Sequence, residues 1–139
     1  MSWLAYALLS ALFAGLVGIF GKIGMRDLDS TLATAARSIV MAAALVTLVS
    51  ARGQLSSLGT IPSKAWLWIC LAGLAGAASW LCYFRAIQIG PVSRVAPIDR
   101  LSVLIAVVSG ALLFGDKISG GVAVGALLVV AGSILIATS

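Results

Sequence analysis

Five long apolar runs dominate this chain, and each is long enough to cross a lipid bilayer as a helix. The hydrocarbon core needs about 20 mainly apolar residues in an α-helix. A soluble fold is excluded, because 62% of the 139 residues are hydrophobic and only 9% are charged, which leaves more apolar surface than a fold of this size can bury. The runs cover residues 3–23, 32–49, 65–89, 92–114 and 118–137.

We therefore expect an all-α integral membrane protein with five transmembrane helices in a single domain over residues 1–139. An odd number of crossings puts the N- and C-termini on opposite sides of the membrane. The third and fourth runs are separated by Gly90-Pro91, a strong turn signal. Four spans with one re-entrant segment are the alternative. The first run has no basic segment before it, so we do not expect it to be a cleaved signal peptide.

The composition also limits the possible functions. The net charge of +5 comes from cations scattered through an apolar chain, which is typical of helix ends against anionic headgroups rather than of nucleic-acid binding. Histidine is absent, so histidine-based metal sites and acid–base chemistry are absent too. No nucleophile–base pair is visible. We expect no enzyme, no metal, no cofactor and no nucleic-acid partner, and we expect contact with the lipid bilayer.

The two ends of the predicted bundle carry similar numbers of cations, so the positive-inside rule gives little guidance on orientation. Two interpretations stay open: other factors decide one orientation, or copies insert both ways up (dual topology). The end that holds the turns after the first and third spans has Arg26 and Arg94, with Lys22 and Arg85 close to it. The opposite end has Arg52, Lys64 and Lys117.

Three charged residues lie several residues inside predicted spans, away from their ends: Arg37, Asp99 and Arg100. Each costs about 2.5–3.5 kcal/mol near a helix centre, and such residues usually face a bundle interior or a wet cavity. Asp99 needs a cation from another helix, for which Arg37 and Arg85 are candidates. This carboxylate is either a structural half of one ion pair or a functional group. The excess of cations at this end suits a ligand that carries a carboxylate or another anion.

Further candidates lie close to these charges. Pro97 predicts a kink beside Asp99, unless the fourth helix simply begins near Pro97. Trp80 and Tyr83 lie inside the third span, where they form either core packing or the wall of a ligand pocket. Small residues recur along the fifth span, where they pack either within the chain or in a homodimer. They are Gly121, Gly125 and Gly132.

The motifs around these residues resemble the EamA domain of the drug/metabolite transporter superfamily. They are YFRAI at 83–87, GPVSRVAPIDRLS at 90–102 and LFGDKI at 113–118, followed by the glycine-rich fifth span. Asp116 departs from the pattern, because the family more often has Glu there. Most EamA proteins carry two inverted five-helix domains in one chain. This chain has one, as in the short bacterial and archaeal transporter branch, and its first span lacks the carboxylate that couples protons in small multidrug relatives.

The resemblance implies a multi-pass secondary transporter of the inner cell membrane that moves small molecules by alternating access. For this chain we expect substrates that are small polar, amphoteric or anionic metabolites and an antiparallel homodimer as the working form. Asp99 would be the switchable group, and Arg37, Arg85 and Arg100 would hold substrate charge. The alternative is an accessory membrane subunit, or a lipid-linked flippase component, that acts with an unlike partner and binds lipid phosphate.

Overall fold

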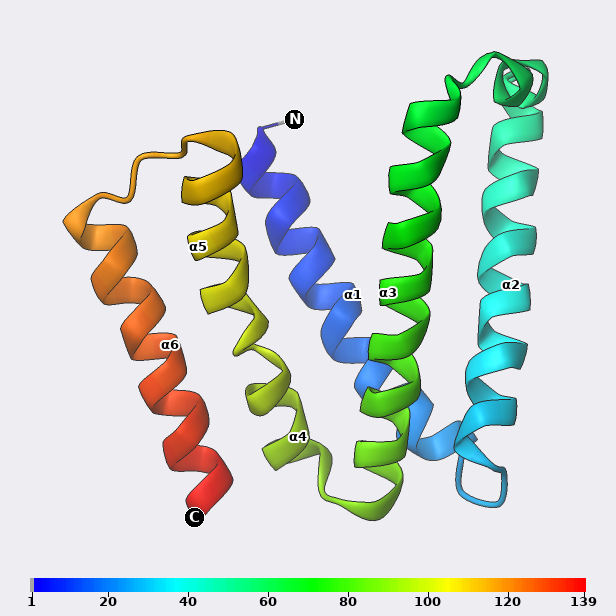
Figure 1. Ribbon diagram of the computed structural model, residues 1–139. Helices are drawn as coiled ribbons and strands as arrows, with labels where there is room; N and C mark the ends of the chain where they lie inside the picture. Colours follow the sequence, from blue (N-terminus) through cyan, green and yellow to red (C-terminus); the bar gives the residue numbers. More distant parts are fainter. Residues whose placement is uncertain (1) are drawn as a thin grey trace. The chain divides into compact units, whose positions relative to one another are not determined.

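The computed structural model describes residues 2–139 and contains five helices long and apolar enough to cross a membrane (Figure 1). Residues 2–139 contain no strand. The five-span, all-α prediction is therefore confirmed. The helices are α1 (Trp3–Gly24), α2 (Ser30–Ala51), α3 (Ser63–Ile89), the interrupted stretch of α4 (Val92–Asp99) and α5 (Ser102–Phe114), and α6 (Gly120–Thr138).

The chain divides into two compact units, which are described separately. The first unit runs up to Phe20 and resumes from Ile89 to Ser139, and the second unit comprises Gly21–Gln88. The first therefore holds most of α1 together with α4, α5 and α6. The second holds the last turn of α1 together with α2 and α3, which are joined by the short 3-10 helix η1 (Leu55–Thr60).

In the first unit, α6 packs against α4 and α5 (Figure 1). Ala126 and Ser133 are the buried residues of α6. The hydroxyl of Ser133 donates to the carbonyl of Val129 at 2.7 Å, so this polar group is satisfied inside the helix. The start of α1 and the end of α6 lie at opposite ends of this unit, as an odd number of crossings requires (Figure 1).

The fourth span is broken between α4 and α5. The N–H of Arg100 bonds the carbonyl of Pro97 at 3.0 Å, and the N–H of Leu101 bonds that of Ile98 at 2.9 Å. These bonds reach back three residues instead of four, so the chain tightens into a 3-10 turn. The expected distortion is present, but it follows Pro97 by one turn. The alternative prediction, that the fourth helix begins near Pro97, is wrong, because α4 starts at Val92 and contains Pro97.

In the second unit, α2 begins at a well-formed cap. The carboxylate of Asp29 accepts the backbone N–H groups of Thr31 at 2.8 Å and Leu32 at 3.1 Å. These donors stabilise the ionised form, so they hold the pKa of Asp29 below its usual range. The cap satisfies two N–H groups that the first turn of a helix cannot pair internally.

The last turn of α3 is fixed by polar contacts to the segment that precedes α2. The ammonium of Lys22 donates to the carbonyls of Ile87 and Gln88. A cation at this position suits the negative end of the helix dipole. The side-chain amide of Gln88 donates to the carbonyl of Leu28 at 2.7 Å. Lys22 thus has a structural role at the end of α3.

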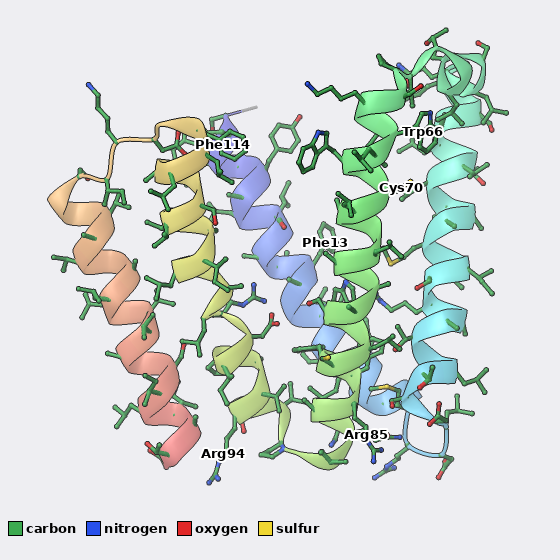
Figure 2. All side chains as sticks on the ribbon, in the orientation of Figure 1. Phe13, Trp66, Cys70, Arg85, Arg94 and Phe114 are labelled. Atoms are coloured by element: carbon green, nitrogen blue, oxygen red, sulfur yellow. The ribbon has the colours of Figure 1, made fainter. Side chains whose placement is uncertain are left out.

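The core of the second unit is small and sits at the same end. Phe84 and Ile87 on α3 are almost completely buried, as is Met25 just after α1. Most other large apolar side chains project outward along the helices, as expected for surfaces that face acyl chains (Figure 2). The second unit therefore concentrates its tight packing close to Lys22.

Candidate functional site

The central feature of the second unit is a contact between α2 and α3 inside their predicted spans. The guanidinium carbon of Arg37 lies 3.8 Å from the ring centre of Trp80 and 5.6 Å from that of Phe84. A cation over an aromatic face is worth about 0.5–2 kcal/mol, and more where water is excluded. This contact explains how the charge of Arg37 is stabilised about 10 Å along α2, at a rise of about 1.5 Å per residue.

The aromatic face under Arg37 is held by other rings. Trp80 meets Tyr83 nearly edge-on, with centroids 5.6 Å apart and an interplanar angle of 82°. It also meets Phe84 at 5.5 Å and 69°. Edge-to-face pairs of this kind are favoured by the charge distribution of the rings. Trp80 is therefore oriented before any ligand arrives.

Gly21 completes this arrangement, and sequence reasoning missed it. A methyl group built on Gly21 would lie 3.0 Å from Cε1 of Phe84 and 3.5 Å from Cδ1 of Ile87. The absence of a side chain at Gly21 thus lets the buried ring of Phe84 sit against the end of α1. The signal in the sequence is weak, because a glycine one residue before Lys22 resembles many others in this chain.

A cavity of about 420 Å³ lies between α2 and α3, with Arg37 and Trp80 in its wall. Ser38 is the other polar lining residue, and its hydroxyl donates to the carbonyl of Thr34 at 2.9 Å. The volume falls within the range of about 300–1,000 Å³ that small-ligand sites occupy. The remaining lining residues are apolar or small: Met41, Ala42, Leu45, Gly73, Gly76 and Ala77.

Two other candidates in this unit lie outside the cavity lining. Tyr83 supports Trp80 and is half-buried. Arg85 is exposed close to the end of α3 (Figure 2), where its Nη1 donates to Oε1 of Gln88 at 2.9 Å. Its positive charge also contributes to the lowered pKa of Asp29. The structure therefore brings Arg37 and Trp80 together in the wall of the cavity between α2 and α3. It places Arg85 with the polar groups at the C-terminal end of α3.

The remaining charged candidates belong to the first unit. An open groove of about 610 Å³ there is lined by α1, α4 and α6, and it includes Pro97, Arg100 and Gly132. Asp99 is half-buried as the last residue of α4, outside that lining. Because Asp99 lies in one unit and Arg37 in the other, their pairing stays a prediction.

The glycine stripe of α6 is open on its own chain. A methyl group built on Gly125 would meet no atom within 4 Å, and one on Gly121 would meet only Oγ of Ser119, at 3.9 Å. Gly132 instead lines the groove that holds Arg100. The close approach that small residues permit is therefore not used by Gly121 and Gly125 within the described residues 2–139.

Five apolar helices long enough to cross a membrane, together with the comparisons that follow, define a multi-pass membrane protein of the transporter class rather than an enzyme. The chain belongs to the EamA-like transporter family, whose model matches residues 1–138. A relative from Sinorhizobium sp., named as an uncharacterized transporter in the cobO 3′ region, is 40% identical over 136 residues, which is 98% of this chain and 96% of the relative. No solved structure matches the chain.

Proposed function

We propose that this protein is a secondary transporter of small amphoteric or anionic metabolites, such as amino-acid-like or organic-acid-like molecules, in the inner cell membrane. The observation that carries the proposal is the guanidinium of Arg37, which lies over Trp80 in the wall of the cavity between α2 and α3. The resemblance of the whole chain to a transporter family supports the same function.

The geometry at Arg37 leaves its hydrogen-bonding edge available. The contact of the guanidinium with the Trp80 ring is a cation–π contact and needs none of the five N–H donors of the guanidinium. The structure records no hydrogen bond from Arg37 to any of the described residues 2–139. Two parallel N–H donors match the two oxygens of a carboxylate. A bound anion would therefore complete the site.

Asp99 and Arg100 supply the conformational part of the proposal. Asp99 ends α4, and Arg100 begins the 3-10 turn before α5. Interrupted helices with charged groups are where transporters commonly bind and move their substrates. We assign Asp99 as the switchable group, which exchanges its charged partners as substrate binds. Arg100 and Arg85 would help to bind the negative charge of the substrate while the transporter opens alternately to the two sides of the membrane.

The working form in this proposal is an antiparallel homodimer. One five-helix domain over residues 1–139 provides half of an inverted two-domain transporter, and a second copy in the opposite orientation provides the other half. The similar cation counts at the two ends permit insertion both ways up. The open face at Gly121 and Gly125 on α6 offers a surface for close helix contact.

The test is solute flux into lipid vesicles that contain only this protein. We expect saturable uptake of one or more organic acids or amino acids. Arg37→Gln should abolish this uptake, because loss of a hydrogen bond to a charged group costs about 1.5–3 kcal/mol, or more than tenfold in binding. Asp99→Asn should abolish turnover while it leaves substrate binding intact.

Arg94→Gln is the matched control, because Arg94 is exposed near the start of α4 (Figure 2) and should leave uptake unchanged. Folding of each variant is checked by its elution as a single species and by its helicity. Failure of every metabolite class to enter vesicles, with uptake restored only by a second protein, would overturn the proposal in favour of an accessory role.

A further inference from the structure

We infer that the cavity between α2 and α3 takes an amphipathic monocarboxylate, with its carboxylate on Arg37 and its hydrocarbon body extending along the helices toward Leu45 and Gly73. The inference rests on the proposed function and narrows its substrate class. It also assigns Gly73 and Gly76 as residues that set the length of the hydrocarbon body.

The cavity has a polar end and an apolar end. The helices α2 and α3 run antiparallel (Figure 1). The contact of Arg37 with Trp80 therefore places Leu45 near Gly73 at the far end of the cavity. The lining residues of α2 extend about 12 Å from Arg37 to Leu45, at a rise of about 1.5 Å per residue. A ligand that fills this length has one charged end only.

The charges of the lining favour one kind of anion. Arg37 is the single cation among the nine lining residues, which include no carboxylate. The ammonium group of an amino acid would therefore meet no anionic partner in this lining. A second carboxylate at the far end of a dicarboxylic acid would lie against Leu45 and glycines, where burial of an unpaired charge is costly. One carboxylate with an apolar tail satisfies both ends.

The two glycines of the lining keep the far end open. A methyl group built on Gly73 or Gly76 would meet no atom within 4 Å, so neither glycine is needed for close packing of the protein. A larger side chain at either position would project into open space. Gly76 lies one helical turn from Trp80, and Gly73 lies one turn further away, so they border successive segments of the tail.

Binding can be measured through Trp80 alone. The chain has four tryptophans, and W3F, W66F and W68F together leave the one that contacts Arg37. The probes are hexanoate, adipate, norleucine and hexylamine, which share a six-carbon chain and differ in their charged groups. We expect saturable binding of hexanoate. Adipate and norleucine should bind at least about tenfold more weakly, and hexylamine should not change the Trp80 signal. Arg37→Gln should remove the change in Trp80 fluorescence on addition of hexanoate. A change caused only by partition of hexanoate into detergent would persist in this variant.

The length assignment is tested by Gly76→Leu. This change should weaken hexanoate binding by about tenfold or more, since the leucine takes the room of several methylenes of the tail, which then lose their burial. Acetate, which needs only the Arg37 end, should change less than about threefold. Ala75→Leu places a leucine at an exposed position of α3 outside the lining, and it should change the affinity for neither acid. Gly73→Val provides a second variant should Gly76→Leu misfold.

The outcomes separate this inference from the proposed function. Norleucine or adipate binding as tightly as hexanoate would overturn the monocarboxylate assignment, while vesicle uptake of those solutes would still support a transporter. Equal losses of acetate and hexanoate in Gly76→Leu would overturn the role of the glycines. Hexanoate binding without any vesicle flux would leave the ligand site standing and contradict the transporter proposal.

Discussion

At the scale of single residues, the stack of Arg37 on Trp80 depends on the shape of a guanidinium as well as on its charge. Arg37→Lys keeps the charge but replaces a planar group with a compact ammonium that neither stacks nor offers two parallel donors. We expect anion binding to weaken by about tenfold or more. Titration of the single-tryptophan protein with hexanoate measures the change. Equal affinity in the variant would show that charge alone suffices.

The contact between Gly21 and Phe84 gives a second prediction at this scale. Gly21→Ala puts a methyl group 3.0 Å from Cε1 of the buried Phe84 ring, so this ring, against which Trp80 packs, must shift by a few tenths of an ångström. Overpacking of this kind costs about 1–3 kcal/mol. We expect a lower unfolding temperature in detergent and a changed Trp80 emission.

Gly24→Ala is the control for Gly21→Ala. Gly24 ends the same helix, and a methyl group there meets no atom within 4 Å. This variant should leave stability unchanged or slightly raised, because alanine reduces the freedom of the unfolded chain. If the two variants behave alike, helix propensity and not the contact with Phe84 governs the effect.

The residues of the site differ in how far the sequence predicts them. Arg37 and Trp80 stand out because a charge and a large ring inside apolar runs need an explanation. Their mutual contact is not visible in the sequence, since it depends on the register of two helices separated by a loop. Arg85 resembled them by position, yet its guanidinium bonds Gln88 at the end of α3. Gly21 has no functional group that would mark it in the sequence, and its role follows only from its contact with Phe84 in the folded chain.

At the scale of elements, the cap of α2 predicts a pH dependence. The lowered pKa of Asp29 means that its carboxylate stabilises the folded state above the unfolded pKa of about 3.9, and that this contribution is lost as the pH falls through the folded value. Asp29→Ala should therefore lower the unfolding temperature at neutral pH, and the gap to the wild type should close in acid. Thermal scans followed by helicity measure it.

Asp29→Asn separates capping from titration. The amide oxygen still accepts the N–H groups of Thr31 and Leu32 but does not ionise, so the stability of this variant should follow pH less steeply than that of the wild type. A gap between Asp29→Ala and wild type that persists unchanged in acid would contradict the assigned role of the carboxylate.

The break between α4 and α5 gives the second prediction for an element. Pro97 cannot donate a hydrogen bond inside α4, and the chain tightens one turn later at Arg100 and Leu101. Pro97→Ala should restore the missing donor and raise stability by about 1–3 kcal/mol, yet slow uptake by making the fourth span more regular. Unfolding temperature and vesicle flux measure the two effects. Unchanged flux would show that the break has no part in transport.

The elements themselves were largely predictable. Runs of about 20 apolar residues fix the spans, because a lipid environment leaves a helix as the way to pair every backbone group. The ends shifted by a few residues: α2 begins at Ser30 where Asp29 caps it, and α6 begins at Gly120. The position of the break was not predictable from Pro97 alone, since the tightening depends on which carbonyls the following N–H groups reach.

At the scale of the whole molecule, we propose that two copies of the five-helix domain form the transporter as an antiparallel homodimer, with identical chains inserted in opposite orientations. Gly125→Leu should weaken this dimer if α6 forms the interface, because a bulky side chain keeps helix backbones apart. Cross-linking in vesicles measures the dimer fraction. Ala131→Leu, at an exposed position of the same helix, is the matched control.

Dual topology can be tested by biasing the charge of each end separately. Ser56→Lys with Ser57→Lys adds cations to the α2–α3 connection, and Asp27→Lys with Thr31→Lys adds them to the α1–α2 connection and the first turn of α2. By the positive-inside rule each pair should fix one orientation, and the two orientations should be opposite. Reporters fused to the C-terminus measure the orientation. Each biased protein should then be inactive alone, and co-expression of the two should restore uptake. Full activity of either biased protein alone would contradict the antiparallel arrangement, because all copies of that protein have the same orientation in the membrane.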